Sequence, residues 1–163
     1  MRILSVDQST TQTGYAVFDG GDLRSYGVLK STGKDSTARM ADMCHKIQLL
    51  IKKHKPSMMV IEKVSLHSSV TVLVSLANLQ GAIFQMCYEK DLGYVLYAPS
   101  TWRRIIGIIG GRLKRDQYKK KAIAFVENSY GITVNDDCAE AICMGLAYLI
   151  DTGVVAPMEE SNE

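Results

Sequence analysis

The sequence has few of the residues that crosslink a chain or carry it through a membrane. Only four of its 163 residues are cysteines, and no two form a Cys-x-x-Cys pair: Cys44, Cys87, Cys138 and Cys143. This spacing argues against a zinc site and a disulfide framework, and favours a reducing compartment. Asp7 closely follows the N-terminus, so we expect no signal peptide. We also expect no membrane span, because no apolar run reaches the required ~18 residues.

Strong compositional bias is also absent. Hydrophobic residues make up 47% and charged residues 22% of the chain, which is ordinary for a globular protein. The net charge is only +2, there is no internal repeat, and 163 residues are enough to bury one core. We therefore expect a single domain over residues 1–155, followed by an acidic tail at 156–163.

Hydrophobic spacing predicts alternating strands and helices. Short apolar runs bounded by turn residues predict strands at residues 3–7, 13–19, 23–30, 58–62 and 93–97. Apolar residues three and four apart predict helices at about 40–54, 70–90, 101–109, 118–126 and 135–150. The first three strands form an antiparallel meander, and the later helix–strand alternation adds two parallel strands. We expect an α/β fold, a mixed five-stranded sheet with helices on both faces.

Two predicted strands end in a carboxylate. Asp7 follows an apolar strand directly, although Asp is depleted in strands, and Glu62 ends the strand at 58–62. If these strands are neighbours, both acids lie at the sheet edge where ligand crevices form. Asp7 capping a turn and Glu62 pairing with Lys63 are the structural alternatives.

A third acidic contribution comes from the last predicted helix. Asp137 and Glu140 are three residues apart and share a helical face, while Asp136 and Glu140, four apart, are the competing pair. Acids at a helix N-terminus are also favoured by the helix dipole alone. Four carboxylates brought together repel one another unless a cation lies among them. Oxygen ligands without His or Cys favour Mg²⁺ or Mn²⁺, and two such ions support phosphodiester hydrolysis.

These motifs resemble the RuvC-type Holliday-junction resolvases of the ribonuclease-H-like superfamily, in particular their phage or bacterial members. The matching segments, in chain order, are Ile3-Leu4-Ser5-Val6-Asp7, Thr13-Gly14-Tyr15-Ala16-Val17, Val60-Ile61-Glu62-Lys63-Val64, Tyr97-Ala98-Pro99 and Asp137-Cys138-Ala139-Glu140-Ala141-Ile142. The resemblance implies a ribonuclease-H-like fold. It also implies that the catalytic residues and ligands of two Mg²⁺ or Mn²⁺ ions are Asp7, Glu62, Asp137 and Glu140.

The sequence departs from the family pattern in three places. Gln8-Ser9 follows Asp7 where the family has Pro-Gly, and Glu140 stands where the family usually has Asp. The family places an aromatic residue, which stacks at the junction centre, shortly after the Glu of its fourth strand. The nearest positions here are Ser65, Leu66 and His67. The sequence therefore leaves open which residue, if any, enters the junction.

A basic stretch lies between the last predicted strand and the acidic helix. Residues 101–121 carry one acid, Asp116, and eight bases: Arg103, Arg104, Arg112, Lys114, Arg115, Lys119, Lys120 and Lys121. The resulting charge of +7 leaves −5 for the rest of the chain, a pattern typical of nucleic-acid binding. By the resemblance, Lys114, Arg115 and Lys119 are candidates to face the scissile phosphate. Trp102 is a candidate to stack on a base, or a core anchor.

Together these features predict a metal-dependent endonuclease that nicks branched DNA such as Holliday junctions, forks or flaps. By resemblance, the products carry 5′-phosphate and 3′-hydroxyl ends, and the protein works as a homodimer in DNA recombination and repair. The compartment is the cytoplasm of a bacterium or phage-infected host. The apolar helix at 70–90, with Leu73 and Phe84, is the interface candidate.

Two other functions compete with this prediction. The segment from Asp7 to Thr11, followed by Gly14, also resembles the phosphate-binding hairpin of actin-like ATPases and sugar kinases. Those proteins close two such domains around a nucleotide. A non-catalytic relative that only binds junctions is the other alternative.

Overall fold

The computed structural model describes residues 1–65, 69–111 and 113–157. Its strands are β1 (Arg2–Asp7), β2 (Gln12–Asp19), β3 (Asp22–Lys30), β4 (Met58–Glu62) and β5 (Gly93–Tyr97). Its helices are α1 (Ser36–His54), α2 (Val70–Glu89), α3 (Pro99–Ile105), α4 (Arg115–Tyr130) and α5 (Asp136–Asp151). The predicted tail at 156–163 lies, from residue 158 on, outside the described residues.

The five strands form one mixed sheet in the order β3-β2-β1-β4-β5. β1 pairs antiparallel with β2, which pairs antiparallel with β3, whereas β4 runs parallel to both β1 and β5. The predicted sheet is thereby confirmed. β1 is the central strand of this order, and both of its faces are covered, so its residues 3–6 are all buried.

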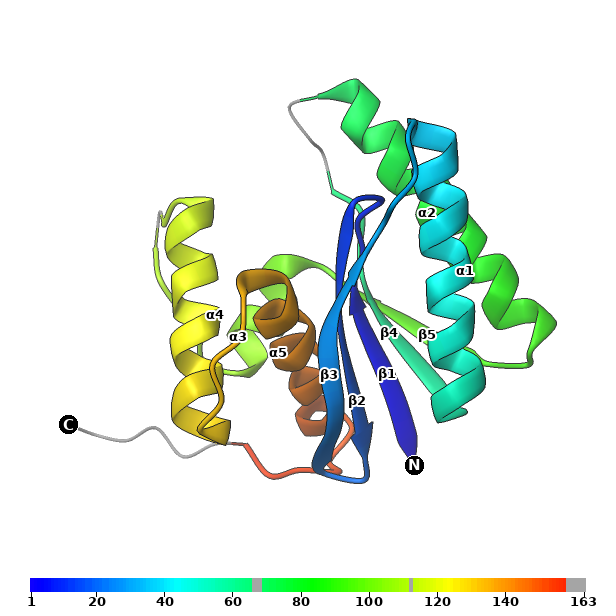
Figure 1. Ribbon diagram of the computed structural model, residues 1–163. Coiled ribbons are helices and arrows are strands. Elements are labelled where there is room, and N and C mark those ends of the chain that lie inside the picture. Colours follow the sequence, from blue (N-terminus) through cyan, green and yellow to red (C-terminus); the bar gives the residue numbers. More distant parts are fainter. Residues whose placement is uncertain (66–68, 112, 158–163) are drawn as a thin grey trace.

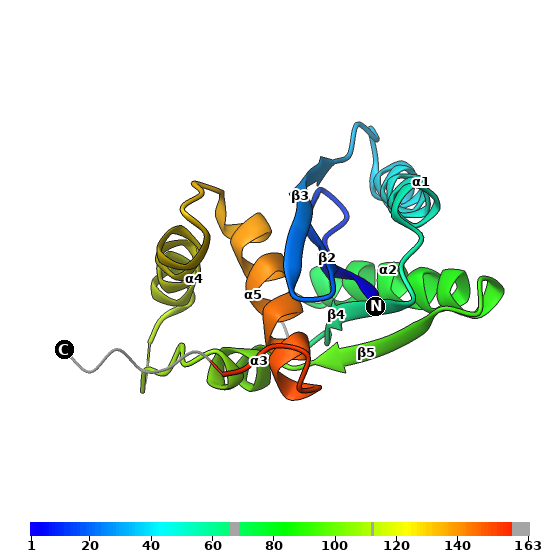
Figure 2. The same cartoon turned by 90° about the horizontal axis from the view of Figure 1, so that it is seen from below.

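Helices cover the two faces of the sheet (Figures 1 and 2): α1 and α2 pack on one face, and α3, α4 and α5 on the other. Successive residues of β1 serve the two layers in turn, since Ile3 belongs to the α5 side and Leu4 to the α1 side. The core is therefore two apolar layers separated by the sheet.

α5 is the most deeply buried helix and packs directly on β1 and β2. Gly145 permits this approach, because a Cβ there would lie 2.6 Å from the Phe18 ring and 3.1 Å from the Ser5 Cβ. The predicted cap is confirmed: Asn135 accepts a hydrogen bond from the Cys138 backbone N–H at 3.1 Å. This cap fixes where α5 begins, and so places the acids of its first turn.

The N-terminal half of α2 is largely exposed, although its sequence is mostly apolar. The buried residues of α2 are confined to its second half: Leu79, Gln80, Ile83, Met86 and Cys87. By length and mean composition alone, α2 is apolar enough to cross a membrane, although polar residues interrupt its apolar run. This is weak evidence for a span, because core helices of soluble proteins pass the same test.

Candidate active site

The four predicted acids line one cleft of about 550 Å³. Asp7 and Glu62 reach it because β1 and β4 are adjacent and parallel, with Val6 opposite Ile61, so that both strands end at the same sheet edge. Asp137 and Glu140 reach it from the first turn and a half of α5. The structure therefore brings together side chains that are up to 133 residues apart in sequence.

Gly14 lets α5 come close enough to deliver Asp137. It lies opposite Asp7 in the β1–β2 pair, and a Cβ at this position would lie 1.9 Å from the backbone oxygen of Asp137. No side chain fits at that distance, because the obstacle is backbone and not a flexible side chain. The Gly in the Thr13-Gly14-Tyr15 segment is thus explained by packing against α5.

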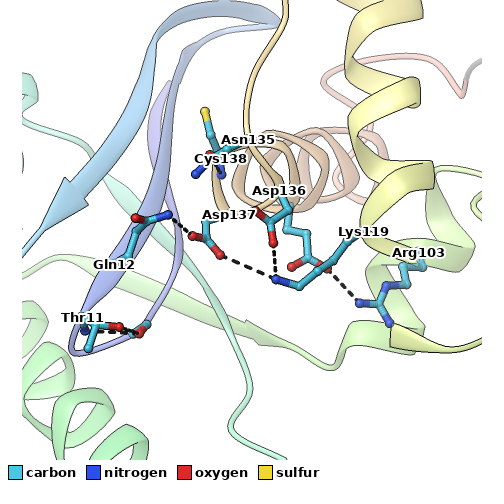
Figure 3. Close-up of polar contacts among 10 residues, drawn as sticks. Thr11, Gln12, Arg103, Lys119, Asn135, Asp136, Asp137 and Cys138 are labelled. Atoms are coloured by element: carbon cyan, nitrogen blue, oxygen red, sulfur yellow. Dashed lines mark hydrogen bonds and ion pairs between the residues drawn. The ribbon is translucent and has the colours of Figure 1, made fainter. Parts of the chain in front are cut away.

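Asp136 and Asp137 have different surroundings (Figure 3). Asp137 lines the cleft, and its Oδ2 accepts a hydrogen bond from Gln12 Nε2 at 2.6 Å. Asp136 instead forms an ion pair with Lys119, whose Nζ is 3.9 Å from Asp137 Oδ1. The hydrogen bond from Lys119 lowers the pKa of Asp136. Of the two neighbours, Asp137 has the place of a cleft acid.

Glu62 is held at both its backbone and its side chain. Its carbonyl accepts hydrogen bonds from Gln8 Nε2 at 3.3 Å and from Gln80 Nε2 at 2.9 Å. Its carboxylate accepts one from Trp102 Nε1 at 3.0 Å. Gln8, which stands where the family pattern has Pro, therefore ties the loop after β1 to the end of β4.

Glu140 forms a largely buried ion pair with Arg103. The distance from Arg103 to Glu140 Oε1 is 3.0 Å, and the two side chains are 16% and 7% exposed. The Arg103 guanidinium also lies 4.9 Å from the Trp102 ring and 4.5 Å from the Tyr118 ring. It is thus a positioned cation at the wall of the cleft and not a mobile surface charge.

The cleft is unfavourable for negative charge. Burial raises the pKa of Asp7 well above its usual value, and repulsion from Glu62, Glu140 and Asp137 raises it further. Burial also raises the pKa of Glu62, although the hydrogen bond from Trp102 acts against this. A cation among these carboxylates would relieve the repulsion.

The donor set fits a hard divalent cation, since it consists of carboxylate oxygens without His or Cys. In residues 1–65, 69–111 and 113–157, however, no three acidic, His or Cys side chains are already arranged around one ion position. The hydrogen bonds of Gln12, Trp102 and Arg103 hold three of the carboxylates toward protein donors. Filling the site would therefore require some of these contacts to be exchanged.

The basic stretch divides into inner and outer cations. Arg103 and Arg115 line the cleft, and Lys119 is half-buried beside the acids of α5. Burial disfavours the charge of Lys119, but the hydrogen bond and the attraction of Asp136 outweigh this and raise its pKa. The outer, exposed bases are Arg104, Lys114, Lys120 and Lys121. Arg112 lies outside the described residues.

Sequence reasoning missed the residues that hold the acids in place. No sequence motif contains these residues: Gln8, Gln12, Gln80 and Tyr118. Only Gln8 had a signal in the sequence, because it stands where the family pattern has Pro. Trp102 is fully buried, so it is a core anchor and not a base-stacking surface. Of the positions considered for the junction centre, Ser65 lines the cleft, whereas Leu66 and His67 lie outside the described residues.

The family model for the crossover junction endodeoxyribonuclease RuvC matches residues 3–146. The chain belongs to the RuvC family. This confirms the predicted family and enzyme class, a crossover junction endodeoxyribonuclease, and RuvC enzymes are metal-dependent nucleases.

Similar RuvC proteins match along most of their length. RuvC of Thermomicrobium roseum is 24% identical over 91% of this chain and 92% of the relative. RuvC of Halorhodospira halophila is 27% identical over 87% and 88%. The chain therefore spans nearly the whole length of these RuvC proteins.

Solved structures match the fold. Thermus thermophilus RuvC in complex with Holliday junction substrate has a TM-score of 0.74 at 14% identity, with 97% of this chain and 100% of that chain covered. The fowlpox virus resolvase, in complex with Holliday junction DNA, has a TM-score of 0.65 at 17% identity, with 93% and 99% covered. The RuvC-like fold predicted from the sequence is confirmed.

Proposed function

We propose that this RuvC-family chain nicks four-way DNA junctions by metal-dependent hydrolysis, with Asp7, Glu62, Asp137 and Glu140 as the ligands of two Mg²⁺ or Mn²⁺ ions. The observation that carries the proposal is the convergence of these four acids in one cleft, at the ends of β1 and β4 and the start of α5. When bound, such ions activate water and stabilise the leaving oxygen of a phosphodiester. The products carry 5′-phosphate and 3′-hydroxyl ends.

The chain's own residues bind and orient the DNA around this cleft. Arg103, now paired with Glu140, is placed to exchange that carboxylate for a phosphate oxygen. Lys119 and Arg115 add positive charge on the same side, where negative charge develops during cleavage. The exposed basic side chains of the stretch contact flanking phosphates, and these contacts supply affinity without sequence information. These side chains are Arg104, Lys114, Lys120 and Lys121. Arg112 belongs to the same proposed DNA-binding set.

The decisive experiment incubates purified protein with labelled four-way junction, fork, flap and linear duplex in Mg²⁺, Mn²⁺ or EDTA. We expect nicking of the branched substrates with either metal and none in EDTA. Asp7→Asn keeps the shape of the side chain but removes its charge, and should abolish nicking while junction binding persists. Equal cutting by this variant would contradict the ligand assignment.

A matched pair of neighbours tests the assignment on α5. Asp137→Asn should lose nicking, since Asp137 lines the cleft, whereas Asp136→Asn should retain most of it, since Asp136 pairs with Lys119 instead. Loss of nicking in Asp136→Asn alone would reverse the two roles.

The two rival functions give different results in the same assays. A protein that binds junctions but leaves them intact in both metals is a non-catalytic relative. A thermal shift with ATP, and none with DNA, favours the nucleotide-binding alternative.

We also propose a two-fold homodimer with α2 at its interface, because resolving a junction takes two symmetric cuts. Residues spaced four and three apart form an apolar stripe along α2, which we call the α2 stripe: Val70, Val74, Ala77, Gly81, Phe84 and Tyr88. All but Phe84 are exposed, and a Cβ at Gly81 would meet no atom within 4 Å. Such spacing suits side-by-side helix packing. Phe84 is less available, because it stacks on Tyr94 at 4.8 Å within the same chain.

The proposal also includes the domain organisation and the cellular compartment. Residues 1–155 act as a single nuclease domain, supported by the two core layers that share one sheet. The cytoplasm is the proposed compartment, supported by four free cysteines.

A further inference from the structure

We propose that Trp102 is a positioning residue for the nuclease site, holding the Glu62 carboxylate with its indole N–H and the Arg103 guanidinium with its ring. The inference rests on the proposed function of the cleft and adds a residue to it. Trp102 is the only tryptophan of the chain and is fully buried in the core layer of α5. Trp102 contacts Glu62 of β4 directly, and it contacts Arg103, which is paired with Glu140 of α5. It therefore links two cleft acids that come from different elements.

The first contact is with Glu62. Trp102 Nε1 donates to Glu62 Oε2 at 3.0 Å, and the indole N–H is a donor without any acceptor capacity. A hydrogen bond to an ionised carboxylate is roughly twice as strong as a neutral one. The Glu62 carbonyl is held separately by Gln8 and Gln80, so the indole is what orients the carboxylate.

The second contact is with the adjacent residue. Arg103 lies between the rings of Trp102 and Tyr118, 4.9 and 4.5 Å from their centres. Its Nε is buried and finds no hydrogen-bond partner in the described part of the chain. The rings therefore hold the guanidinium on its faces, and its Nε edge is enclosed by the protein.

The two contacts explain why the residue is tryptophan and not another large apolar side chain. Phenylalanine would fill most of the same space and keep a ring beside Arg103, but it has no N–H for Glu62. Leucine would keep neither contact. Partners of metal-ligating side chains of this kind orient the ligands.

The test compares Trp102→Phe with wild type and with a control of similar chemistry. Tyr97→Phe removes a hydrogen bond to Asp151 from the same core layer without touching the cleft. We expect Trp102→Phe to raise the Mg²⁺ concentration needed for half-maximal nicking by roughly 10–100-fold. The KM for the junction should stay nearly constant, and Tyr97→Phe should show no change in metal requirement. Equal metal requirements in Trp102→Phe and wild type would overturn the inference and leave a purely structural tryptophan.

A second readout needs no cleavage. Because Trp102 is the only tryptophan, its fluorescence reports directly on the Glu62 contact. We expect Mn²⁺ to quench it in wild type and Glu62→Gln to weaken this response, with metal binding followed independently by thermal unfolding. Metal-induced stabilisation without any change in emission would contradict the proposed contact between tryptophan and ligand.

The two readouts separate this inference from the proposed function. If wild type shows no metal-dependent nicking, the proposed function fails while the fluorescence still tests the Trp102–Glu62 contact. If wild type nicks and Trp102→Phe has the same metal requirement, only the positioning role fails.

Discussion

At the scale of single residues, the cleft depends on neutral side chains and a glycine as much as on its acids. Gln12 holds Asp137, Gln8 and Gln80 hold the backbone of Glu62, and Gly14 leaves room for α5. Amides suit this work because they add hydrogen bonds without adding charge to a site already crowded with carboxylates. Uncharged side chains thus hold Asp137 and Glu62, whereas Glu140 is held by the charged Arg103.

Gly14→Ala tests the close approach of β2 and α5. The added methyl group would overlap the Asp137 backbone, so we expect a loss of roughly 1–3 kcal/mol in unfolding free energy, the range typical of overpacking. Nicking should fall even under conditions in which the variant is still folded, since Asp137 is displaced from the cleft. Urea unfolding and the junction assay measure the two effects. Gly111→Ala is the control, because a Cβ there meets no atom within 4 Å; equal behaviour of both variants would refute the explanation.

Asp7→Asn should make the metal-free protein more stable. The pKa of Asp7 is raised in the fold, so its ionised form penalises the folded state at every pH above the unfolded value of about 3.8. The gain should be about 0.5–2 kcal/mol near neutral pH, shrink as the pH falls toward 3.8 and vanish below that pH, where the carboxyl group is protonated in both states. Urea unfolding in EDTA across this range provides the measurement. A variant less stable than wild type at neutral pH would show that burial and repulsion do not destabilise the ionised form of Asp7.

At the scale of elements, one face of α2 has two functions along its length. Leu79 and Ile83, in the second half, pack into the core, while Val72 and Leu76, in the first half, line the cleft. These four residues are four, three and four positions apart and therefore share one face, whereas the α2 stripe lies on the other side of the helix. A long apolar helix that is only partly used within its own chain is expected at a subunit interface.

Val74→Lys tests the α2 stripe without disturbing the core. Val74 is 50% exposed, so a lysine there is tolerated by the isolated chain but places a charge in the proposed interface. We expect a shift from dimer to monomer in light scattering. Leu49→Lys on α1 makes the same kind of change at a position that is also 50% exposed, and should leave the dimer intact. A dimeric Val74→Lys protein with wild-type nicking would exclude this interface.

At the scale of the whole molecule, charge is separated along the chain. Residues 101–121 carry +7 while the remainder carries −5, although the net charge is only +2. Folding places the basic stretch, as α3 and the start of α4, beside the acidic first turn of α5 (Figure 3). DNA phosphates attracted to the basic side chains of this stretch would thereby be brought close to the cleft acids.

Junction binding should therefore weaken steeply with salt. Replacing the exposed Lys114 and Lys120 by Gln should reduce the slope of log K against log salt by about 1 for each lost phosphate contact. Lys52→Gln with Lys53→Gln removes the same charge from the C-terminal turn of α1 and should leave the slope unchanged. Binding titrations in EDTA at several salt concentrations measure it. Equal slopes for both double variants would indicate attraction by net charge alone.

The sequence alone determined the elements, their order, the acids and the basic stretch. Strand and helix periods are local properties, and the Asn135 cap and the strand-terminal Asp7 and Glu62 were visible as short motifs. Trp102 as a core anchor was one of two options that the sequence left open. The exposure of the first half of α2 was not predicted, because its residues are apolar on every side.

Only the tertiary structure decided which side chains meet. The choice of Asp137 over Asp136 in the cleft depends on the closeness of Gly14 and on Lys119 lying beside Asp136. The links from Gln8 and Trp102 to Glu62 join residues 54 and 40 positions apart. A hydrogen bond depends on distances of a few tenths of an ångström, which strand register and helix packing set and which no local pattern in a sequence encodes.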